Sequence, residues 1–79
     1  MQLEVMGAIL DQETVAEGDA LRLRERLSKA YGPAAWREVK GVARVRLPNG
    51  ALHVVELHWY EAEAVGARDL KIKRYLGEA

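Results

Sequence analysis

The pattern of apolar and polar residues is clearest in the middle of the chain, where it repeats every two residues from Val39 to Leu47. A period of two is typical of a β-strand with one buried face. We name the side that carries Val39, Gly41, Ala43, Val45 and Leu47 the odd face. The opposite side, the even face, carries Lys40, Val42, Arg44 and Arg46. The odd face is apolar, so it is expected to line the core.

The strand ends at a turn signal. Pro48 presets φ at the first central turn position, Asn49 tolerates the second, and Gly50 can adopt a positive φ. This combination predicts a three-residue hairpin in which Leu47 faces Ala51. The register that follows pairs Val45 with His53, Ala43 with Val55, Gly41 with Leu57 and Val39 with Trp59 on the odd face. On the even face it pairs Arg46 with Leu52, Arg44 with Val54, Val42 with Glu56 and Lys40 with His58.

A helical repeat precedes this hairpin, and it predicts a helix over residues 19–31. Its apolar members are Ala20, Leu23, Leu27 and Ala30. Asp19 is suited to cap the first turn, and Gly32 to supply the left-handed position after the last turn. An earlier start stays open, because Thr14 and Glu17 have the spacing of a capping box.

The two ends of the chain are read as strands with different clarity. Residues 2–10 fit a short strand, because Leu3 and Val5 alternate with polar residues, or a buried helix, because residues 6–10 are apolar apart from one glycine. Residues 61–67 are expected to form a loop. A last strand follows, with Leu70, Ile72 and Leu76 on the apolar side and Asp69, Lys71, Lys73 and Tyr75 on the other.

These elements predict a single small domain over residues 1–79 with an α+β fold. In this two-layer arrangement, one main helix packs on the odd face of a three- to four-stranded antiparallel meander. Trp59 is then expected in the core, while His58 is expected to point outward from the even face. Trp36 lies before the regular alternation begins, so the two-residue repeat does not show which face of the sheet it belongs to.

Composition narrows the classes of function. The 12 basic and 12 acidic residues give a net charge of zero, which argues against nucleic-acid binding through bulk charge. The signs are unevenly spread, because residues 1–20 hold five acidic and no basic side chains. The chain has no cysteine, which excludes disulfides and thiolate metal sites. Asn, Ser, Thr and Gln are scarce, as in heat-adapted proteins or in products of a GC-rich genome.

No apolar run approaches the ~20 residues of a membrane span, so a soluble, cytoplasmic protein without membrane contact is expected. His53 and His58 project to opposite faces, so they are not expected to bind one metal ion together. His53 is interpreted as a rim histidine hydrogen-bonded to backbone rather than as a functional group. We expect no metal and no cofactor.

The even face holds the candidate chemistry. Its candidate ligand-binding residues are Arg44, Arg46, His58, Tyr60, Lys71 and Lys73. If the protein is an enzyme, Glu56 and His58 would serve as general base and acid, with Arg44 stabilising a charged transition state. A plain alternative is a solvated face on which opposite charges, such as Arg44 and Glu56, pair across strands.

The sequence HWYEA at residues 58–62, a glycine, and then KIKRYL at residues 71–76 resembles the C-terminal signature of a group of small uncharacterised bacterial proteins. The resemblance covers about residues 39–76 and implies no activity, cofactor or catalytic residue. The expected order of a helix and a meander with a basic face is also similar to small ribonuclease toxins of the RelE type, by fold analogy alone.

Two functions from different classes therefore follow from the sequence. The first is a non-enzymatic binding or interaction module that uses the basic and aromatic even face, with RNA or an acidic protein as partner. The alternative is a metal-independent ribonuclease. The acidic N-terminal segment and the basic C-terminal strand also make a homodimer an option.

Overall fold

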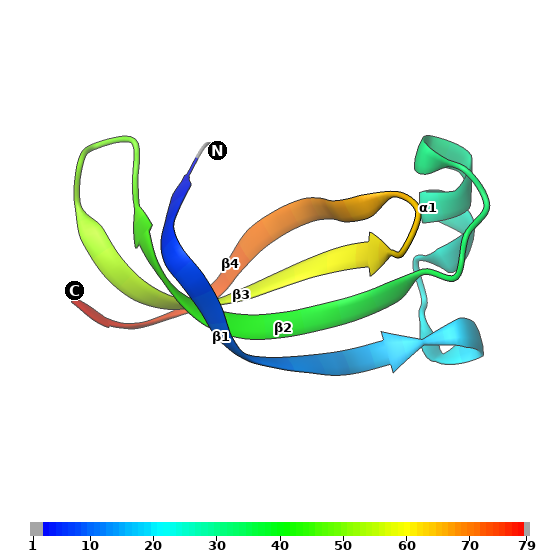
Figure 1. Cartoon of the computed structure of the whole chain (residues 1–79), viewed down its shortest axis with the longest axis horizontal. Helices are drawn as coiled ribbons and strands as arrows, with labels where there is room; N and C mark the ends of the chain where they lie inside the picture. Colours follow the sequence, from blue (N-terminus) through cyan, green and yellow to red (C-terminus); the bar gives the residue numbers. More distant parts are fainter. Residues whose placement is uncertain (1–2, 79) are drawn as a thin grey trace.

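The computed structural model describes residues 3–78 and consists mainly of one antiparallel sheet (Figure 1). Its strands are β1 (Glu4–Glu17), β2 (Arg37–Arg46), β3 (Leu52–Ala62) and β4 (Gly66–Glu78), and they lie in the order β1-β2-β3-β4. Within residues 3–78 the only α-helix is α1 (Arg24–Tyr31), which has eight residues. The expected α+β fold with a main helix packed on the sheet is therefore wrong, because the molecule is a four-stranded meander with one short helix at one end.

The helix is shorter than expected because the preceding strand is longer. Thr14 and Glu17, which have the spacing of a capping box, both lie in β1. Asp19 lies in a short 3₁₀ turn (Gly18–Ala20), and its carboxylate accepts a hydrogen bond from Arg24 at 2.8 Å instead of capping a helix. Pairing with β2 holds this segment extended against its local preference. The helix end was predicted correctly, since Gly32 has a φ of +103°.

β1 settles the two interpretations of residues 2–10 in favour of a strand. Met1 and Gln2, at the start of that segment, lie outside the described residues. The pairing of β1 with β2 is irregular, with register shifts between Met6 and Leu10, between Leu10 and Glu13, and between Thr14 and Ala16. Such bulges bend a strand and strengthen its twist, and Figure 1 shows that β1 curves across the neighbouring strands.

The β2–β3 hairpin has the predicted register at every pair from Val39–Trp59 to Arg46–Leu52. In the connecting turn, the N–H of Gly50 donates to the carbonyl of Leu47 at 2.8 Å, and the N–H of Leu47 donates to the carbonyl of Ala51 at 2.9 Å. The side-chain oxygen of Asn49 accepts a hydrogen bond from the Ala51 N–H at 3.0 Å. The turn chemistry therefore fixes which residues share each face of the sheet.

Gly50 has a φ of +88°, and open space surrounds the position that a β-carbon would occupy. Replacing Gly50 by Val should lower the free energy of unfolding by about 1–2 kcal/mol, because a β-branched side chain resists positive φ. Gly50→Asn is the matched control, since asparagine tolerates this backbone region and should cost less. Thermal unfolding of the two variants measures the difference. Equal melting temperatures for both variants and the wild type would contradict this explanation.

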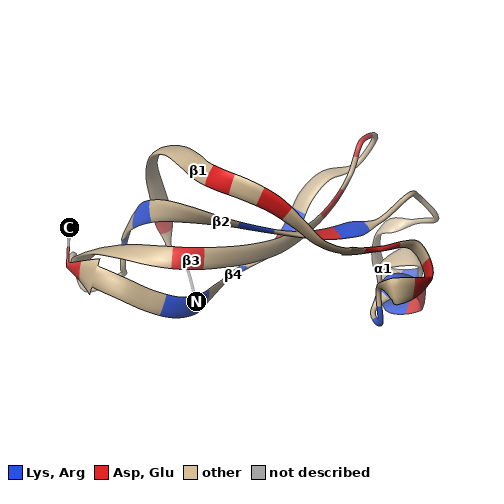
Figure 2. Cartoon of the chain, turned by 90° about the horizontal axis from the view of Figure 1, so that it is seen from below, with Lys and Arg blue, Asp and Glu red and all other residues tan. Residues whose placement is uncertain are grey.

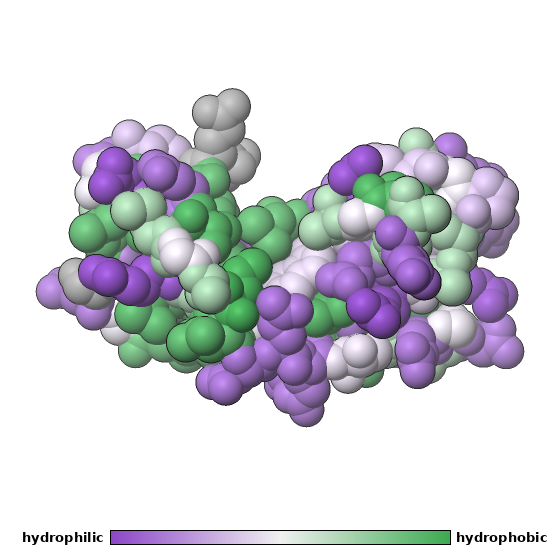
Figure 3. Space-filling model, viewed as in Figure 1, coloured by the Kyte–Doolittle hydropathy of each residue, from purple (hydrophilic) through white to green (hydrophobic). Residues whose placement is uncertain are grey.

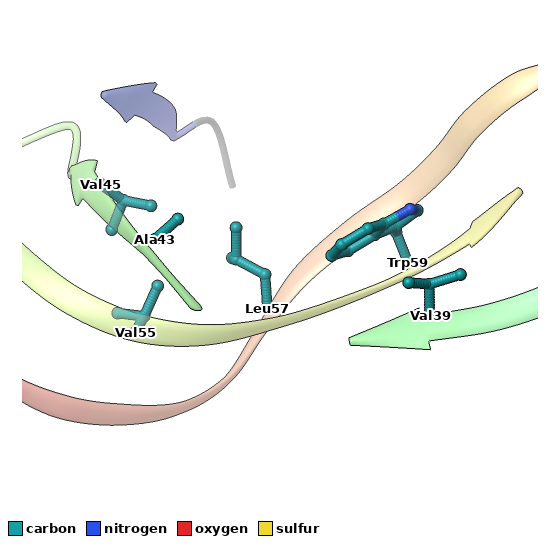
Figure 4. Close-up of a cluster of buried hydrophobic side chains, with 6 residues drawn as sticks. All are labelled: Val39, Ala43, Val45, Val55, Leu57 and Trp59. Atoms are coloured by element: carbon teal, nitrogen blue, oxygen red, sulfur yellow. The ribbon is translucent and has the colours of Figure 1, made fainter. Parts of the chain in front are cut away.

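The odd face of the sheet forms the larger of two hydrophobic cores. This odd-face core consists of Val39, Ala43, Val45, Val55, Leu57 and Trp59 (Figure 4). In the described part of the chain no helix packs on it; instead, Leu3, Val5 and Ile9 from the curved N-terminal segment do. Gly41 allows this close approach, because a β-carbon there would lie 2.5 Å from Ile9 Cγ2. Trp59 is in the core as predicted, and only 3% of its surface is exposed.

The second core lies on the even face, where α1 packs. This helix-side core consists of Leu21, Leu27, Trp36, Tyr60 and Ala62. The helix was expected on the odd face, and that prediction is wrong. Its apolar residues instead meet Trp36 and the end of β3, where the even-numbered residues Tyr60 and Ala62 are apolar. The indole N–H of Trp36 donates to the Gly32 carbonyl at 3.0 Å, which ties the β2 entry to the helix end.

Bulges also change the last strand. The predicted loop at residues 61–67 is reduced to a turn at residues 63–65 between β3 and β4. Glu56 pairs with Arg74, and the next residue of β3, Leu57, pairs with Ile72. Lys73 is therefore an extra residue, a bulge, and beyond it the side chains of β4 lie on the opposite faces from those that strict alternation predicts. Tyr75 therefore lies opposite Val55 on the odd face, which corrects its predicted position. Leu70 and Leu76, both predicted on the apolar side, are exposed.

The molecule is elongated, with principal extents of 36 × 21 × 19 Å. Hydrophobic surface gathers over the half of the molecule away from α1 (Figure 3). Within residues 3–78, no helix has the length and apolar character needed to cross a membrane.

Candidate functional site

His58 lies on the even face of β3, as the register predicted, but it is buried. Its Nδ1 lies 3.0 Å from a carboxylate oxygen of Glu38 on β2, and its Nε2 lies 2.7 Å from a carboxylate oxygen of Glu56. Only the doubly protonated ring can donate from both nitrogens at once. The expectation that His58 points into solvent is wrong, because two glutamates flank it and only 7% of its surface is exposed.

Glu56 joins this cluster to β4. Its second carboxylate oxygen accepts hydrogen bonds from Arg74 Nε at 3.2 Å and pairs with Arg74 Nη2 at 3.0 Å. The hydrogen bond from His58 lowers the pKa of Glu56, and the charge of Arg74 lowers it further, whereas burial opposes both. We name Glu38, His58, Glu56 and Arg74 the charge cluster. It links β2, β3 and β4 across the even face.

The three residues proposed for catalysis are only partly brought together. Glu56 and His58 are in contact, but Arg44 lies opposite Val54 towards the hairpin end of the sheet, where it is exposed. Arg74 is the cation that contacts the Glu56 carboxylate. Because both ring nitrogens of His58 face carboxylates, neither is free to exchange a proton with a bound substrate.

Tyr60 is also buried, at 6% exposure, beneath α1 in the helix-side core. Burial raises the pKa of Tyr60 above its ordinary value, and the nearby negative charges of Glu38 and Asp69 raise it further. The Lys71 ammonium lies 5.8 Å from the centre of the Tyr60 ring, close enough for a cation–π contact. The Tyr60 ring thus stabilises the position of the Lys71 ammonium, and the Tyr60 hydroxyl keeps its proton at neutral pH.

Two adjoining hollows, of about 330 and 360 Å³, lie between the α1 segment and β4. They share Leu23, Tyr60 and Lys71, and together we name them the α1–β4 groove. Its basic lining residues are Arg22, Arg26, Lys71 and Lys73, and its acidic ones are Glu38 and Asp69. Figure 2 shows basic residues on both α1 and β4.

The acidic and basic residues of the groove differ in their partners. Glu38 contacts His58, and Asp69 accepts a hydrogen bond from the Tyr31 hydroxyl at 2.7 Å. In the described part of the chain, none of the four basic residues of the groove forms an ion pair. The groove therefore brings together four basic and two acidic residues, and none of the basic ones is held in an ion pair by the described part of the chain.

The end of the groove is fixed by a contact between α1 and β4. The hydrogen bond to Asp69 raises the pKa of Tyr31, so this hydroxyl remains a donor. The Arg68 guanidinium lies 5.7 Å from the centre of the Tyr31 ring, and the Trp36 ring lies at 5.8 Å. These contacts hold the short helix against the edge strand.

The remaining predicted residues lie elsewhere. Arg46 is on the even face at the hairpin end and pairs with Glu4 at 3.8 Å. His53 projects to the odd face, and its ring packs edge-on against Tyr75 at a centroid distance of 5.1 Å. The structure thus places Lys71, Lys73 and Tyr60 at the groove and separates Arg44 and Arg46 from them. No group of three His, Asp or Glu side chains among residues 3–78 is arranged to hold a metal ion.

Sequence reasoning missed several residues of this region, among them Arg22, Arg26, Glu38 and Arg74. Arg22 and Arg26 have the i,i+4 spacing that places side chains on one side of a helical segment, which was a usable signal. Glu38 shares the even face with Tyr60, its partner on β3, and this follows if the β2 alternation is extended back by one residue. Comparison of the chain with protein-family models, with curated proteins and with solved structures finds no match.

Proposed function

We propose that the protein is a non-enzymatic binding module that takes single-stranded RNA in the α1–β4 groove. One observation carries this proposal: the basic residues that line the groove have no ion-pair partner within residues 3–78. Cations in a groove neutralise successive phosphates and release their counterions, and this release drives the binding of single strands.

The shape and the lining of the groove favour RNA over an acidic protein. A single strand of RNA is narrow enough to lie in the groove, whereas a folded acidic protein is too broad to enter it. Tyr31, whose side chain is partly exposed, lies at the groove beside the basic residues, whereas Tyr60 is buried below Lys71. Basic residues interleaved with aromatic rings are typical of sites for single-stranded nucleic acid.

The ribonuclease alternative has less support. A metal-independent ribonuclease needs a side chain that is free to take a proton from the ribose hydroxyl. His58, the candidate for that role, has both ring nitrogens within hydrogen-bond distance of carboxylates. The binding role requires no such group.

Removing two groove cations should change the salt dependence of RNA binding. With four phosphate contacts, the slope of log affinity against log salt is about −2.8 for a single strand. The double variant Arg26→Ala/Lys71→Ala should bring the slope to about −1.4, because each lost contact removes about 0.7. Fluorescence anisotropy of a labelled oligouridine at several salt concentrations measures this change.

The matched control is Arg44→Ala/Arg46→Ala, which removes two basic residues from the hairpin end of the even face. Its slope should equal that of the wild type. A loss of binding in the control but not in the groove variant would assign the site to the open sheet face instead. A labelled glutamate-rich peptide that binds in place of the oligouridine would identify an acidic protein as the partner. Cleavage of RNA by the wild type in EDTA, lost in His58→Gln, would support the ribonuclease.

A further inference from the structure

Charge alternates from strand to strand across the even face. The acidic residues of β1 face the basic residues of β2, and Glu56 of β3 faces the basic residues of β4. The ion pairs that join these neighbours are Glu4–Arg46 at 3.8 Å, Glu13–Lys40 at 3.6 Å and Glu56–Arg74 at 3.0 Å. Opposite charges on adjacent strands stabilise a sheet and select the neighbour.

The alternation is left open at both edges of the sheet. β1 and β4 are the edge strands, and each has one side without a neighbouring strand among the described residues. β1 carries four acidic residues and no basic one. β4 carries four basic and two acidic residues, and neither Arg68, Lys71 nor Lys73 has an ion-pair partner in residues 3–78. If the alternation of charge continued beyond β4, the next strand would be an acidic one, as β1 is.

The apolar surface is concentrated on the same two strands. Of the large apolar side chains exposed within the described residues, all except Tyr31 lie on β1 or β4: Leu10, Val15, Leu70, Tyr75 and Leu76. The accessible surface is 5452 Å², whereas a compact monomer of 8.8 kDa exposes about 4,800 Å². The radius of gyration is 13.3 Å, compared with about 11.6 Å for a compact chain of this length. The excess of roughly 700 Å² approaches the ~800 Å² that one partner buries in a standard interface.

The directions of the strands allow one copy of the chain to pair with both edge strands of another. In an antiparallel meander of four strands, β1 and β4 run in opposite directions, so β1 of a second copy lies antiparallel to β4 when the two-fold axis runs along the strands. The Glu13–Glu17 end of β1 then lies beside the start of β4, where Arg68 and Lys71 are located. The same two-fold axis brings β4 of the second copy to β1 of the first.

We propose that the partner of these edges is a second copy of this chain, and that two copies form a closed dimer through two equivalent β1–β4 contacts. Each contact joins an acidic edge to a basic edge and covers exposed apolar residues of both strands. Closure leaves neither sheet with an open edge, and a two-fold arrangement stops at two copies rather than growing into a filament.

A charge-exchange experiment tests this proposal with two variants. Glu13→Lys/Glu17→Lys makes the β1 edge basic, and Arg68→Glu/Lys73→Glu makes the β4 edge acidic. Each variant alone opposes like charges at both contacts, so its dimer should be at least about 100-fold weaker than that of the wild type. An equimolar mixture restores opposite charges at both contacts and should form a heterodimer. Sedimentation velocity at low and physiological salt, with circular dichroism as the check of folding, measures both results.

Several results would overturn the proposal. A wild type that stays monomeric up to high micromolar concentration would do so, as would folded variants that remain dimeric alone. Two folded monomeric variants whose mixture does not dimerise would place the interface elsewhere. If the β4 variant dimerises with the wild type as strongly as with the β1 variant, then the contact joins two β4 strands instead. The β4 variant changes Lys73 of the groove, so RNA binding is checked with the β1 variant, which leaves all four basic residues of the groove in place.

Discussion

Trp59→Ala is expected to lower the free energy of unfolding by about 3–5 kcal/mol, the usual cost of truncating a buried tryptophan. Its indole is 3% exposed and lies in the odd-face core beside Val39 and Leu57 (Figure 4). The indole N–H also donates to a carboxylate oxygen of Glu61 at 2.6 Å. A domain of this length has a total stability of about 4–12 kcal/mol, so the variant should lose a large part of it and unfold at a much lower urea concentration.

Urea unfolding followed by circular dichroism measures this loss. Trp59→Phe is the control, because it keeps an aromatic ring in the core and loses mainly the contact with Glu61. The free energy of unfolding should fall by less than half as much in Trp59→Phe as in Trp59→Ala. A Trp59→Ala protein that unfolds at the wild-type urea concentration would show that the odd-face core tolerates a cavity of this size, and would undermine the description of its packing.

His58→Ala should lower the free energy of unfolding by about 2–3 kcal/mol, because hydrogen bonds to charged groups are among the stronger ones in proteins. The ring bridges Glu38 and Glu56, and its removal leaves two half-buried carboxylates close to one another without the group between them. This value replaces the change of about 0.5 kcal/mol or less that an outward-facing histidine would give.

The control for His58 is the other histidine. His53 packs edge-on against Tyr75 and contacts no carboxylate within residues 3–78, so His53→Ala should cost about 1 kcal/mol. Urea midpoints of the two variants at neutral pH give the comparison. If the two alanine variants are equally stable, then water replaces the imidazole at no cost and the charge cluster does not hold the strands together.

The hairpin was the most predictable part of the fold. Its register depends on a short local signal, Pro48-Asn49-Gly50, which selects one turn type, and the pairing of two strands then follows residue by residue. The same signal placed Trp59 in the core and His53 and His58 on opposite faces. Local chemistry is sufficient there because turn geometry and face alternation are short-range properties.

The layer arrangement was not predictable in the same way. Period two gives the face of each residue but not the curvature of the sheet, and curvature lets β1 cover the odd face without a helix. The bulge at Lys73 has no distinctive signal, yet it moves Tyr75 to the odd face. The burial of His58 depends on Glu38, which lies 20 residues away in the sequence and is adjacent only after β2 and β3 pair.

For the candidate site, the sequence singled out strand residues that line the groove, but not the residues that surround them. Lys71, Lys73 and Tyr60 lie at the groove as a group, while Arg44 and Arg46 share their face but lie at the other end of the sheet. Face alternation cannot distinguish the two ends of a long strand. The position of α1, which completes the groove, depends on the helix-side core and therefore on long-range packing.

Within the described residues, the two cores lie on opposite faces and share no residue, and β3 contributes side chains to both. Such a chain contains two regions that can open with different free energies, because the loss of one set of apolar contacts leaves the other intact. The helix-side region rests on fewer strands and would exchange its amide hydrogens faster than the centre of the sheet. A ligand in the groove would slow exchange in α1, whereas a partner at the strand edges would slow it in β1 and β4. The amide exchange pattern thus distinguishes the two interactions without any substitution.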